Sequence, residues 1–257
     1  MPTVKDVPGP LGIRVRRRWK ALLRGGFRNH ENDLRYDLNQ LQVFQMALRR
    51  HGRSFRQFRS ILEFGCGYGR LTRHLFDLAP EAAIFGCDVS TRDITWCRAK
   101  YPRGRFLKND PHPPLDLPDQ QCDLILSYSV FTHLSEENHK GWLKDLSRIL
   151  KPGGLMLHTV HSGLCLDLIS SFSPERLANY RLGGSVEQFL SSELPYHYVP
   201  YSMDQPEYGL TIIRPEYIRR VWPQVSGLQV IDYVGGAIAA FPEGCQDLVV
   251  LRREGTA

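Results

Sequence analysis

The stretch ILEFGCGYGRLTRHL, residues 61–75, decides the fold class of this chain. A short apolar run precedes three glycines at every second position, Gly65, Gly67 and Gly69, and a helical pattern follows them. Because glycine has no Cβ, it lets a phosphate or carboxylate group approach the backbone N–H groups. A strand that turns sharply into a helix also directs the positive end of the helix dipole toward that group. The stretch therefore predicts a strand–turn–helix unit with a ligand lying against the turn.

The spacing of the glycines distinguishes between classes of nucleotide-binding turn. Dinucleotide-binding folds use G-x-G-x-x-G, which would place the third glycine at position 70. Arg70 stands there, and the glycine is at 69. This spacing disfavours a nicotinamide-dependent oxidoreductase, and the surrounding residues have to identify the ligand.

Strands and helices are predicted to alternate along the chain. The predicted strands are Ile61–Phe64, Ala83–Cys87, Arg105–Leu107, Leu124–Tyr128, Leu155–Val160, Leu228–Val234 and Asp247–Leu251. The predicted helices are 33–51, Leu71–Leu78, Arg92–Tyr101, His139–Leu150 and Pro215–Trp222. This alternation predicts a parallel sheet covered by helices on both faces. Lys151–Gly154 is expected to stop a helix and form a tight turn.

Polar residues recur where successive predicted strands end. Glu63 ends the first strand, where a carboxylate can face an ammonium group. Asp88 follows the second strand, where a carboxylate can accept both hydrogen bonds of a ribose diol. Asn109–Asp110 follows the third strand, where either side chain can meet an adenine amino group, and Ser127–Tyr128 closes the fourth. One such residue is usually a surface polar group, but their joint recurrence indicates a ligand-binding edge.

With these motifs in place, the sequence resembles a class I S-adenosylmethionine-dependent methyltransferase. The segments that carry the resemblance, in family order, are ILEFGCGYGRLTRHL, IFGCDVS, FLKND, LPDQQCDLILSYSVFTHL and LSRILKPGGLMLHTV. The closing YIRRVW, LQVIDYV and QDLVVLRR resemble the family's last helix and antiparallel hairpin. The resemblance implies an α/β, Rossmann-like, seven-stranded, mostly parallel sheet with helices on both faces. It also implies an antiparallel last strand and a lid insert after the fifth strand.

The resemblance also implies a cofactor, S-adenosyl-L-methionine, and a place for each residue around it. The residues implied to border its methionine half are Glu63, Gly65, Cys66, Gly67 and Gly69. The residues implied around its nucleoside are Asp88 at the ribose and Val89, Asn109 and Asp110 at the adenine. Ser127 and Tyr128 are implied beside the sulfonium and its methyl group, which makes Tyr128 a catalytic candidate. Which of the two residues after the third strand meets the adenine amino group stays open.

Histidines are the candidates for removing a proton from an oxygen nucleophile, because their pKa suits that role near neutral pH. His161 ends the predicted fifth strand at the ligand edge, and His133 follows the fourth strand on the substrate side. His133 has a second interpretation, as a residue that bonds backbone at the start of a helix. We expect His158 to face away from the ligand edge, into helix packing, and His112 to lie at the surface.

These patterns predict four parts in the chain. They are a basic leader at 1–32, a cofactor-binding core at 33–161, a substrate lid insert at 162–210 and the completion of the sheet at 211–257. The aromatic residues that gather near the end of the insert are Tyr196, His197, Tyr198, Tyr201 and Tyr208. Rings with polar tips suit a lid over a sugar or an aromatic ring, or they fill the core of a small subdomain.

Charge is concentrated at the amino end of the chain. The formal net charge is +6, but residues 1–30 hold eight basic residues and one acidic residue, which leaves the remainder slightly acidic. By charge, the body of the protein is not expected to bind nucleic acid. Residues 13–24 show the apolar spacing of one helix face with arginines opposite. They are expected either to contact a membrane surface or to dock on their own domain.

The cysteine pattern and the hydropathy of the chain limit the classes of protein that remain. Six scattered cysteines without a CxxC pair argue against a zinc site or a disulfide framework, and metal independence is expected. No apolar run reaches the roughly 18 residues needed to cross a bilayer, and no secretory signal is recognised. A cytoplasmic protein is expected, with peripheral contact to the inner membrane surface as the alternative.

The expected function is methyl transfer to an oxygen of a small metabolite or of a sugar or glycan. Nucleic-acid and amine methylating members of the family often show an Asn-Pro-Pro-Tyr-like element after the fourth strand, and LSYSVF stands there instead. Two alternatives stay open. One is a noncatalytic module that binds the cofactor, and the other is a membrane-associated methyltransferase for lipid-linked substrates. The sequence does not indicate an oligomeric state.

Overall fold

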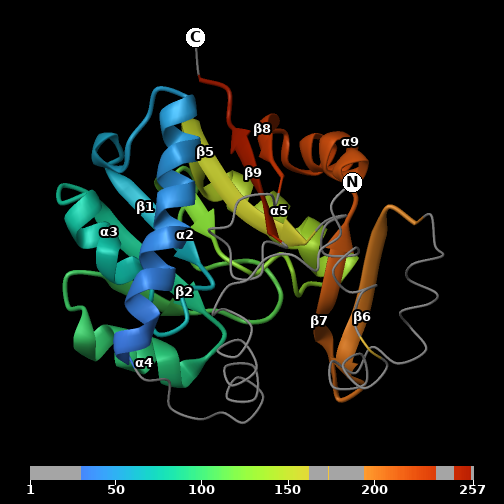
Figure 1. The fold of residues 1–257 in the computed structure, drawn as a ribbon, viewed down its shortest axis with the longest axis horizontal. Coiled ribbons are helices and arrows are strands. Elements are labelled where there is room, and N and C mark those ends of the chain that lie inside the picture. The colour runs from blue at the N-terminus through green and yellow to red at the C-terminus, as the bar shows by residue number, and fades with distance from the viewer. Residues whose placement is uncertain (1–29, 162–172, 174–193, 236–245, 256–257) are drawn as a thin grey trace, which may run out of the picture. The chain divides into compact units, whose positions relative to one another are not determined.

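The computed structural model describes residues 30–161, 173, 194–235 and 246–255 (Figure 1). The chain divides into two compact units, Met1–Tyr36 and Asp37–Ala257. Of the first unit, only residues 30–36 are described, and they form the start of helix α2 (His30–Arg50). The basic segment at 13–24 lies outside the described residues. No helix in the described ranges is long and apolar enough to cross a membrane.

A seven-stranded sheet organises the second unit. Its spatial order is β3 (Arg105–Lys108), β2 (Ala83–Asp88), β1 (Ser60–Phe64), β4 (Cys122–Ser127), β5 (Leu150–His161), β9 (Gln246–Arg252) and β8 (Gln229–Val234). The first five strands pair in parallel, and β9 pairs antiparallel with both β5 and β8. The predicted Rossmann-like sheet with an antiparallel last strand is confirmed.

Helices cover both faces of this sheet. They are α2, α3 (Thr72–Leu78), α4 (Thr91–Lys100), α5 (Glu136–Ile149) and α9 (Pro215–Ser226), with a 3-10 turn at Phe55–Gln57. Neighbouring residues of β5 belong to different cores, because successive side chains of a strand point to opposite faces. Met156 lies in a cluster with Trp142 of α5 and Trp222 of α9. Leu157 lies in a cluster with Phe44 of α2, so the sheet is buried on both sides.

Local capping explains where the helices begin and end. Helix α5 starts at Glu136, one turn before the predicted His139, because the Ser135 side chain accepts a hydrogen bond from the backbone N–H of Asn138. The helix ends at Ile149, one residue before the predicted Leu150. The expected tight turn at 151–154 is instead part of strand β5, where Gly153 adopts a φ of 75°. Backbone hydrogen bonds to Arg253 hold these residues beside the end of β9.

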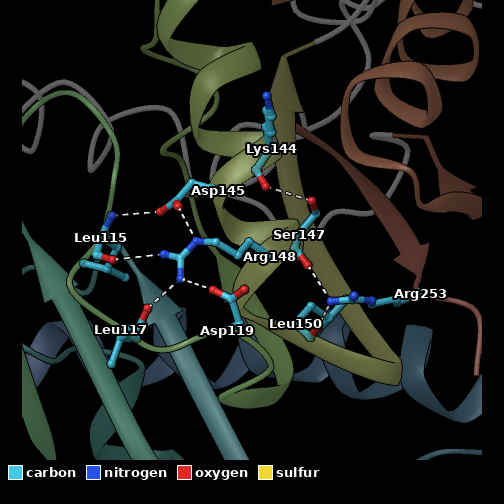
Figure 2. Close-up of polar contacts among 9 residues, drawn as sticks. All are labelled: Leu115, Leu117, Asp119, Lys144, Asp145, Ser147, Arg148, Leu150 and Arg253. Atoms are coloured by element: carbon cyan, nitrogen blue, oxygen red, sulfur yellow. Dashed lines mark hydrogen bonds and ion pairs between the residues drawn. The ribbon is translucent and has the colours of Figure 1, made fainter. Parts of the chain in front are cut away.

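The long connection between β3 and β4 is held against α5 by Arg148 (Figure 2). Its guanidinium donates to the carbonyls of Leu115 and Leu117, at 3.1 and 2.7 Å. The same group pairs with the carboxylates of Asp119 and Asp145, at 2.7 and 2.9 Å. Asp145 also accepts from the backbone N–H of Leu115 at 2.8 Å. One side chain thus fixes an irregular segment that starts at the ligand edge of the sheet.

A separate antiparallel hairpin, β6 (Tyr196–Ser202) and β7 (Gln205–Ile213), follows the undescribed part of the insert (Figure 1). This hairpin was not predicted from the sequence, and the expected end of the insert at residue 210 falls inside β7. The free edge of β7 pairs with the segment after β4, since the N–H groups of Gly209 and Thr211 donate to the carbonyls of His133 and Thr132. The hairpin is therefore tied to the substrate side of β4.

Candidate functional site

The three glycines of the first turn all have positive φ angles, but for different reasons. A Cβ on Gly65 would lie 2.2 Å from Cγ2 of Val130, and one on Gly69 would lie 2.7 Å from Cε2 of Tyr101. A Cβ on Gly67, where φ is 51°, would meet no atom within 4 Å. Packing thus requires the outer two glycines, whereas the middle glycine leaves open space over the backbone, as a ligand would need.

Asp88 holds this turn in place. One carboxylate oxygen accepts from the backbone N–H of Gly67 at 2.8 Å, and the other accepts from that of Ser90 at 2.9 Å. The N–H groups of Gly65 and Cys66 both donate to the carbonyl of Cys87 at 2.9 Å. Burial raises the pKa of Asp88, and the two backbone hydrogen bonds oppose that shift. Each carboxylate oxygen keeps a further lone pair, which leaves acceptor capacity for a ligand.

Glu63 lies below the turn, in the fully buried strand β1. Its carboxyl group accepts a hydrogen bond from the hydroxyl of Thr72, the first residue of α3. Burial disfavours the charged form and raises the pKa of Glu63 to about 8, against opposing contributions from Thr72 and Arg70. A buried carboxyl with such a pKa is poised to ionise when a cation approaches.

The end of β3 separates the two candidates that the sequence left open. Asp110 is exposed, and its carboxylate pairs with the Lys108 ammonium at 2.8 Å, which lowers the pKa of Asp110. Asn109 is buried, and its amide nitrogen donates to the carbonyl of Asp110 at 2.8 Å. Its Oδ1 atom is buried without a hydrogen-bond partner among the described residues. Such an atom is costly to bury and fits a ligand N–H donor.

Val89 and Cys66, which the resemblance also implies beside the cofactor, differ from each other in exposure. Val89 is 53% exposed, directly after Asp88, and is available to a ligand. The Cys66 thiol is buried in a cluster with Cys97 and Phe106, so its side chain belongs to the core and only its backbone lies at the turn.

The side chains of Ser127 and Tyr128, at the end of β4, point in different directions. Ser127 is fully buried, and its hydroxyl lies 2.8 Å from Nδ1 of His158. Its side chain is therefore in the core, whereas the resemblance implies a place beside the sulfonium. Tyr128 lies at the glycine turn, because the Arg70 guanidinium stacks over its ring at 5.3 Å. His158 faces away from the ligand edge, as expected.

The other two histidines are held by strand β7. Nδ1 of His133 lies 2.8 Å from the carbonyl of Gly209, and Nδ1 of His161 lies 3.2 Å from the carbonyl of Thr211. The ring centroids of the two histidines are 6.4 Å apart. Burial lowers the pKa of His133 to about 4. The structure thus brings together the two histidines that the sequence proposed as bases.

Two tyrosines of the hairpin surround His133. The ring of Tyr208 lies 4.8 Å from that of His133, and the ring of Tyr201 lies 5.9 Å from it. Burial raises the pKa of Tyr208, and the Asp88 carboxylate adds to that effect. The hairpin is therefore within electrostatic reach of the glycine turn. His112, by contrast, is exposed and bonded to Asn138, away from this group.

Some of the groups that build the site were not predicted from the sequence. Thr72, which bonds Glu63, and Val130, which contacts Gly65, lie within the quoted motifs, but the motifs do not single these two residues out. The carbonyls that orient the histidines are backbone atoms, which carry no residue-specific signal. Among the described residues, no three His, Cys, Asp or Glu side chains converge as a metal site would require.

The comparisons with known proteins agree with this geometry. Residues 61–154 match the methyltransferase domain family. The malonyl-[acyl-carrier protein] O-methyltransferase of Priestia megaterium is 30% identical over 180 residues, which cover 68% of this chain and 65% of that protein. The tRNA N(3)-cytidine methyltransferase METTL2 of Gallus gallus is 31% identical over 107 residues, covering 38% of this chain and 29% of that protein. The chain thus spans less than two thirds of the length of these relatives.

A solved structure shares the fold over most of the chain. An S-adenosylmethionine-dependent methyltransferase from Mesorhizobium loti superposes with a TM-score of 0.56 at 18% identity, over 80% of this chain and 96% of that one. The matched residues include the glycine turn and Asp88, which ends β2. Residues 61–154 therefore carry a methyltransferase domain, and the chain is similar to S-adenosylmethionine-dependent methyltransferases in sequence and in fold.

Proposed function

We propose that the protein binds S-adenosylmethionine and transfers its methyl group to an oxygen of a small metabolite or of a sugar. The observation that carries the cofactor assignment is the buried Oδ1 of Asn109 at the carboxyl end of β3, which has no hydrogen-bond partner in the part of the chain that the structure describes. An adenine amino group supplies the donor that this atom lacks. The open backbone at Gly67, on the same sheet edge, fits the rest of the ligand.

The other residues at this edge of the sheet bind different parts of the cofactor. Asp88 keeps acceptor capacity for the ribose hydroxyls while it fixes the turn. Glu63 provides a carboxylate for the ammonium group of the methionine half, beneath the backbone of Gly65 and Gly67. When bound, the cofactor supplies an electrophilic methyl group with its own leaving group. The protein then has to align an acceptor oxygen with that methyl group and exclude other nucleophiles.

The acceptor side of the site consists of Tyr128, His133 and His161 together with the hairpin. An acceptor oxygen between the glycine turn and these rings has a hydrogen-bonding partner in either histidine. The two named relatives act on very different substrates, a malonyl-[acyl-carrier protein] and a tRNA. A small acceptor is favoured here because the chain beyond residue 30 is slightly acidic, which does not suit a polyanionic RNA.

The proposal is tested first by calorimetric titration of the full chain with S-adenosylmethionine and S-adenosylhomocysteine. We expect binding, and we expect Asn109→Leu to weaken it about tenfold, since the variant removes the acceptor of the adenine amino group. Asp110→Asn is the matched control, because that side chain is 80% exposed and pairs with Lys108. Equal losses in both variants, or no binding by the folded wild-type chain, would contradict the cofactor assignment.

Turnover is tested separately from binding. Incubation with a panel of hydroxyl-bearing metabolites and sugars, followed by mass spectrometry for a gain of one methyl group, identifies the acceptor. Tight binding of the cofactor without methylation of any acceptor would favour the noncatalytic module over the enzyme.

A further inference from the structure

We propose that His133 and His161 form a pair of neutral acceptors whose Nε2 atoms receive the hydroxyl group of the methyl acceptor. The pair selects an un-ionised hydroxyl on a ring compound over a carboxylate. The inference rests on the proposed methyl transfer and adds the chemical class of its acceptor. It also assigns roles in the substrate site to the hairpin residues Tyr201 and Tyr208.

The protonation pattern of the two rings follows from their partners. A backbone carbonyl only accepts, so Nδ1 of each ring must carry the proton that it donates, His133 to Gly209 and His161 to Thr211. The hydroxyl of Tyr201 lies 3.4 Å from Nδ1 of His133, farther than the 2.8 Å of the carbonyl, and does not compete for the proton. In a neutral imidazole the other nitrogen then bears a lone pair. Both Nε2 atoms are acceptors.

The two partner carbonyls belong to one strand, which sets the two rings together. Gly209 and Thr211 are alternate residues of β7, so their carbonyls point to the same edge of that strand. The backbone at His133 pairs with this edge as well, through the N–H of Gly209. Within the described residues, neither Nε2 atom has a hydrogen-bond partner. Strand β7 therefore presents two acceptors side by side, 6.4 Å between ring centroids.

This pair lies close to the position where the methyl group is delivered. Val130 contacts Gly65 of the glycine turn, and the N–H of His133 donates to the carbonyl of Val130. His133 is thus one short turn away from the cofactor edge. On its other side lies Tyr208, whose pKa is raised by burial and further by the Asp88 carboxylate. An acceptor molecule held against these rings lies near the ribose side of the proposed cofactor site.

Two hydrogen-bond acceptors, the Nε2 atoms of His133 and His161, favour a substrate hydroxyl group over a carboxylate. A hydroxyl group donates its proton to Nε2 and keeps its lone pairs for the methyl group. A carboxylate has no proton to donate, so its oxygens would face two lone pairs in a partly buried site, which is unfavourable. The aromatic faces of Tyr208 and Tyr201 provide the contact area for a planar or sugar ring that bears the hydroxyl.

The transfer balances with these groups alone. The acceptor oxygen forms a bond to the methyl carbon, and the carbon–sulfur bond breaks with its electron pair remaining on sulfur. The hydroxyl proton moves to Nε2 of His161, which later returns it to solvent. His133 remains neutral at physiological pH, since burial lowers its pKa to about 4, and it acts as the second acceptor.

The protonation pattern is measured without any substrate. Long-range proton–nitrogen correlation NMR of the full chain, free and with S-adenosylhomocysteine, reports which ring nitrogen carries the proton. We expect the Nδ1–H form for both His133 and His161, assigned through His133→Gln and His161→Gln. The Nε2–H form in either ring would overturn the inference. Because this measurement needs no cofactor, its outcome is independent of whether the proposed function is correct.

Ligand selection is measured by adding three probes to the protein saturated with S-adenosylhomocysteine. The probes are p-cresol, methyl α-D-glucopyranoside and p-toluate, a phenol, a sugar and a carboxylate. We expect one or both hydroxyl probes to shift the Nε2 signals, and their comparison shows which ring type is accepted. Preference for p-toluate, or no shift with any probe, would overturn the inference.

Substitutions at His133 distinguish a role of the ring as a hydrogen-bond acceptor from a role in packing alone. His133→Leu removes an acceptor and is expected to weaken the bound hydroxyl probe about fivefold, whereas His133→Gln keeps an acceptor oxygen and restores most of the affinity. His112→Gln is the matched control, because that ring is exposed and lies outside the site. Equal affinities in His133→Leu and His133→Gln would show that the ring acts only through packing.

Discussion

Substitution of Gly67 by alanine separates the conformational role of this glycine from its role in binding. Its φ of 51° lies in the left-handed region, and an added Cβ would meet no protein atom within 4 Å. The only intrinsic penalty of Gly67→Ala is therefore backbone strain, about 1–2 kcal/mol. In a protein of this size, that loss lowers the melting temperature by about 2–8 °C. The fold should survive.

The binding penalty has a different origin. The space that the new methyl group fills is the space over the backbone that we assign to the cofactor. A ligand in van der Waals contact with the Gly67 backbone has to move away from it, which separates it from Asp88 and Asn109. We expect at least a tenfold loss of affinity for S-adenosylhomocysteine, equivalent to about 1.4 kcal/mol.

Gly52 offers a matched control for the strain. Its φ is 66°, and a Cβ there would also meet nothing within 4 Å, but it lies in the turn after α2. Gly52→Ala should lower the melting temperature by a similar amount and leave the affinity unchanged. Thermal denaturation and calorimetric titration of both variants measure the two effects. If Gly67→Ala binds S-adenosylhomocysteine as well as Gly52→Ala does, the ligand does not lie against the glycine turn.

Three further predictions concern protonation and the Arg148 contacts. Since burial raises the pKa of Glu63 to about 8, this carboxyl group is protonated at pH 7, and binding of a ligand ammonium group should release its proton. Affinity for S-adenosylmethionine should then rise with pH up to about 8, and the calorimetric heat at pH 7 should depend on the ionisation enthalpy of the buffer; a heat that is the same in phosphate and Tris would contradict this. Burial also lowers the pKa of His139 and of His158 to about 3. As the pH falls from about 6.5 toward 3, the two imidazoles become protonated in the unfolded chain but stay neutral in the folded chain. Each ring should therefore lower the free energy of unfolding by about 1.4 kcal/mol per pH unit. Urea denaturation at pH 7 and pH 5 measures the slope, and His139→Gln should remove one ring's share; an unchanged slope would show that this ring does not contribute. Arg148→Ala should lower the free energy of unfolding by about 1–2 kcal/mol, mostly through the unpaired carbonyls of the β3–β4 connection, because its ion pairs are partly exposed. Arg92→Ala, which breaks an exposed pair in α4, is the control, and equal losses in the two variants would argue against the assigned role.

The architecture was predictable because several local signals agree with one another. The glycine turn, the alternation of apolar segments and the helix stop at Lys151–Gly154 all indicate a parallel sheet with crossover helices. The polar residues after the strands meet for a topological reason, since the carboxyl ends of parallel strands share an edge. For that reason Glu63 and Asp88 lie at one turn, although 25 positions separate them in the sequence.

The directions of individual side chains were not predictable. Ser127 and Tyr128 are consecutive residues at a strand end, so one faces the core and the other the glycine turn, and the sequence does not say which. The choice between Asn109 and Asp110 depended on Lys108, which holds the exposed carboxylate away. A sequence pattern gives the place of a residue along a strand, but its burial is decided by neighbours that are distant in the chain.

The hairpin was missed because its strand signal is irregular. Tyr196–Ser202 alternates weakly and contains Pro200, which argues against a central strand. The structure places β6 at the edge of a two-stranded sheet, where proline is tolerated. The orientation of His133 and His161 could not be predicted either, because it depends on backbone carbonyl groups, which every residue type has.

The use of carbonyl groups to hold the two histidines has a consequence for changing the methyl acceptor that we propose for this protein. Because backbone carbonyls hold both rings, side chains of the hairpin can be exchanged to alter the contact with the proposed acceptor while these two contacts remain. Gly209 is the exception, since a Cβ there would lie 2.2 Å from the carbonyl oxygen of Val199. A library randomised at Tyr201 and Tyr208, with Gly209 kept, is therefore a direct route to catalysts for new acceptors.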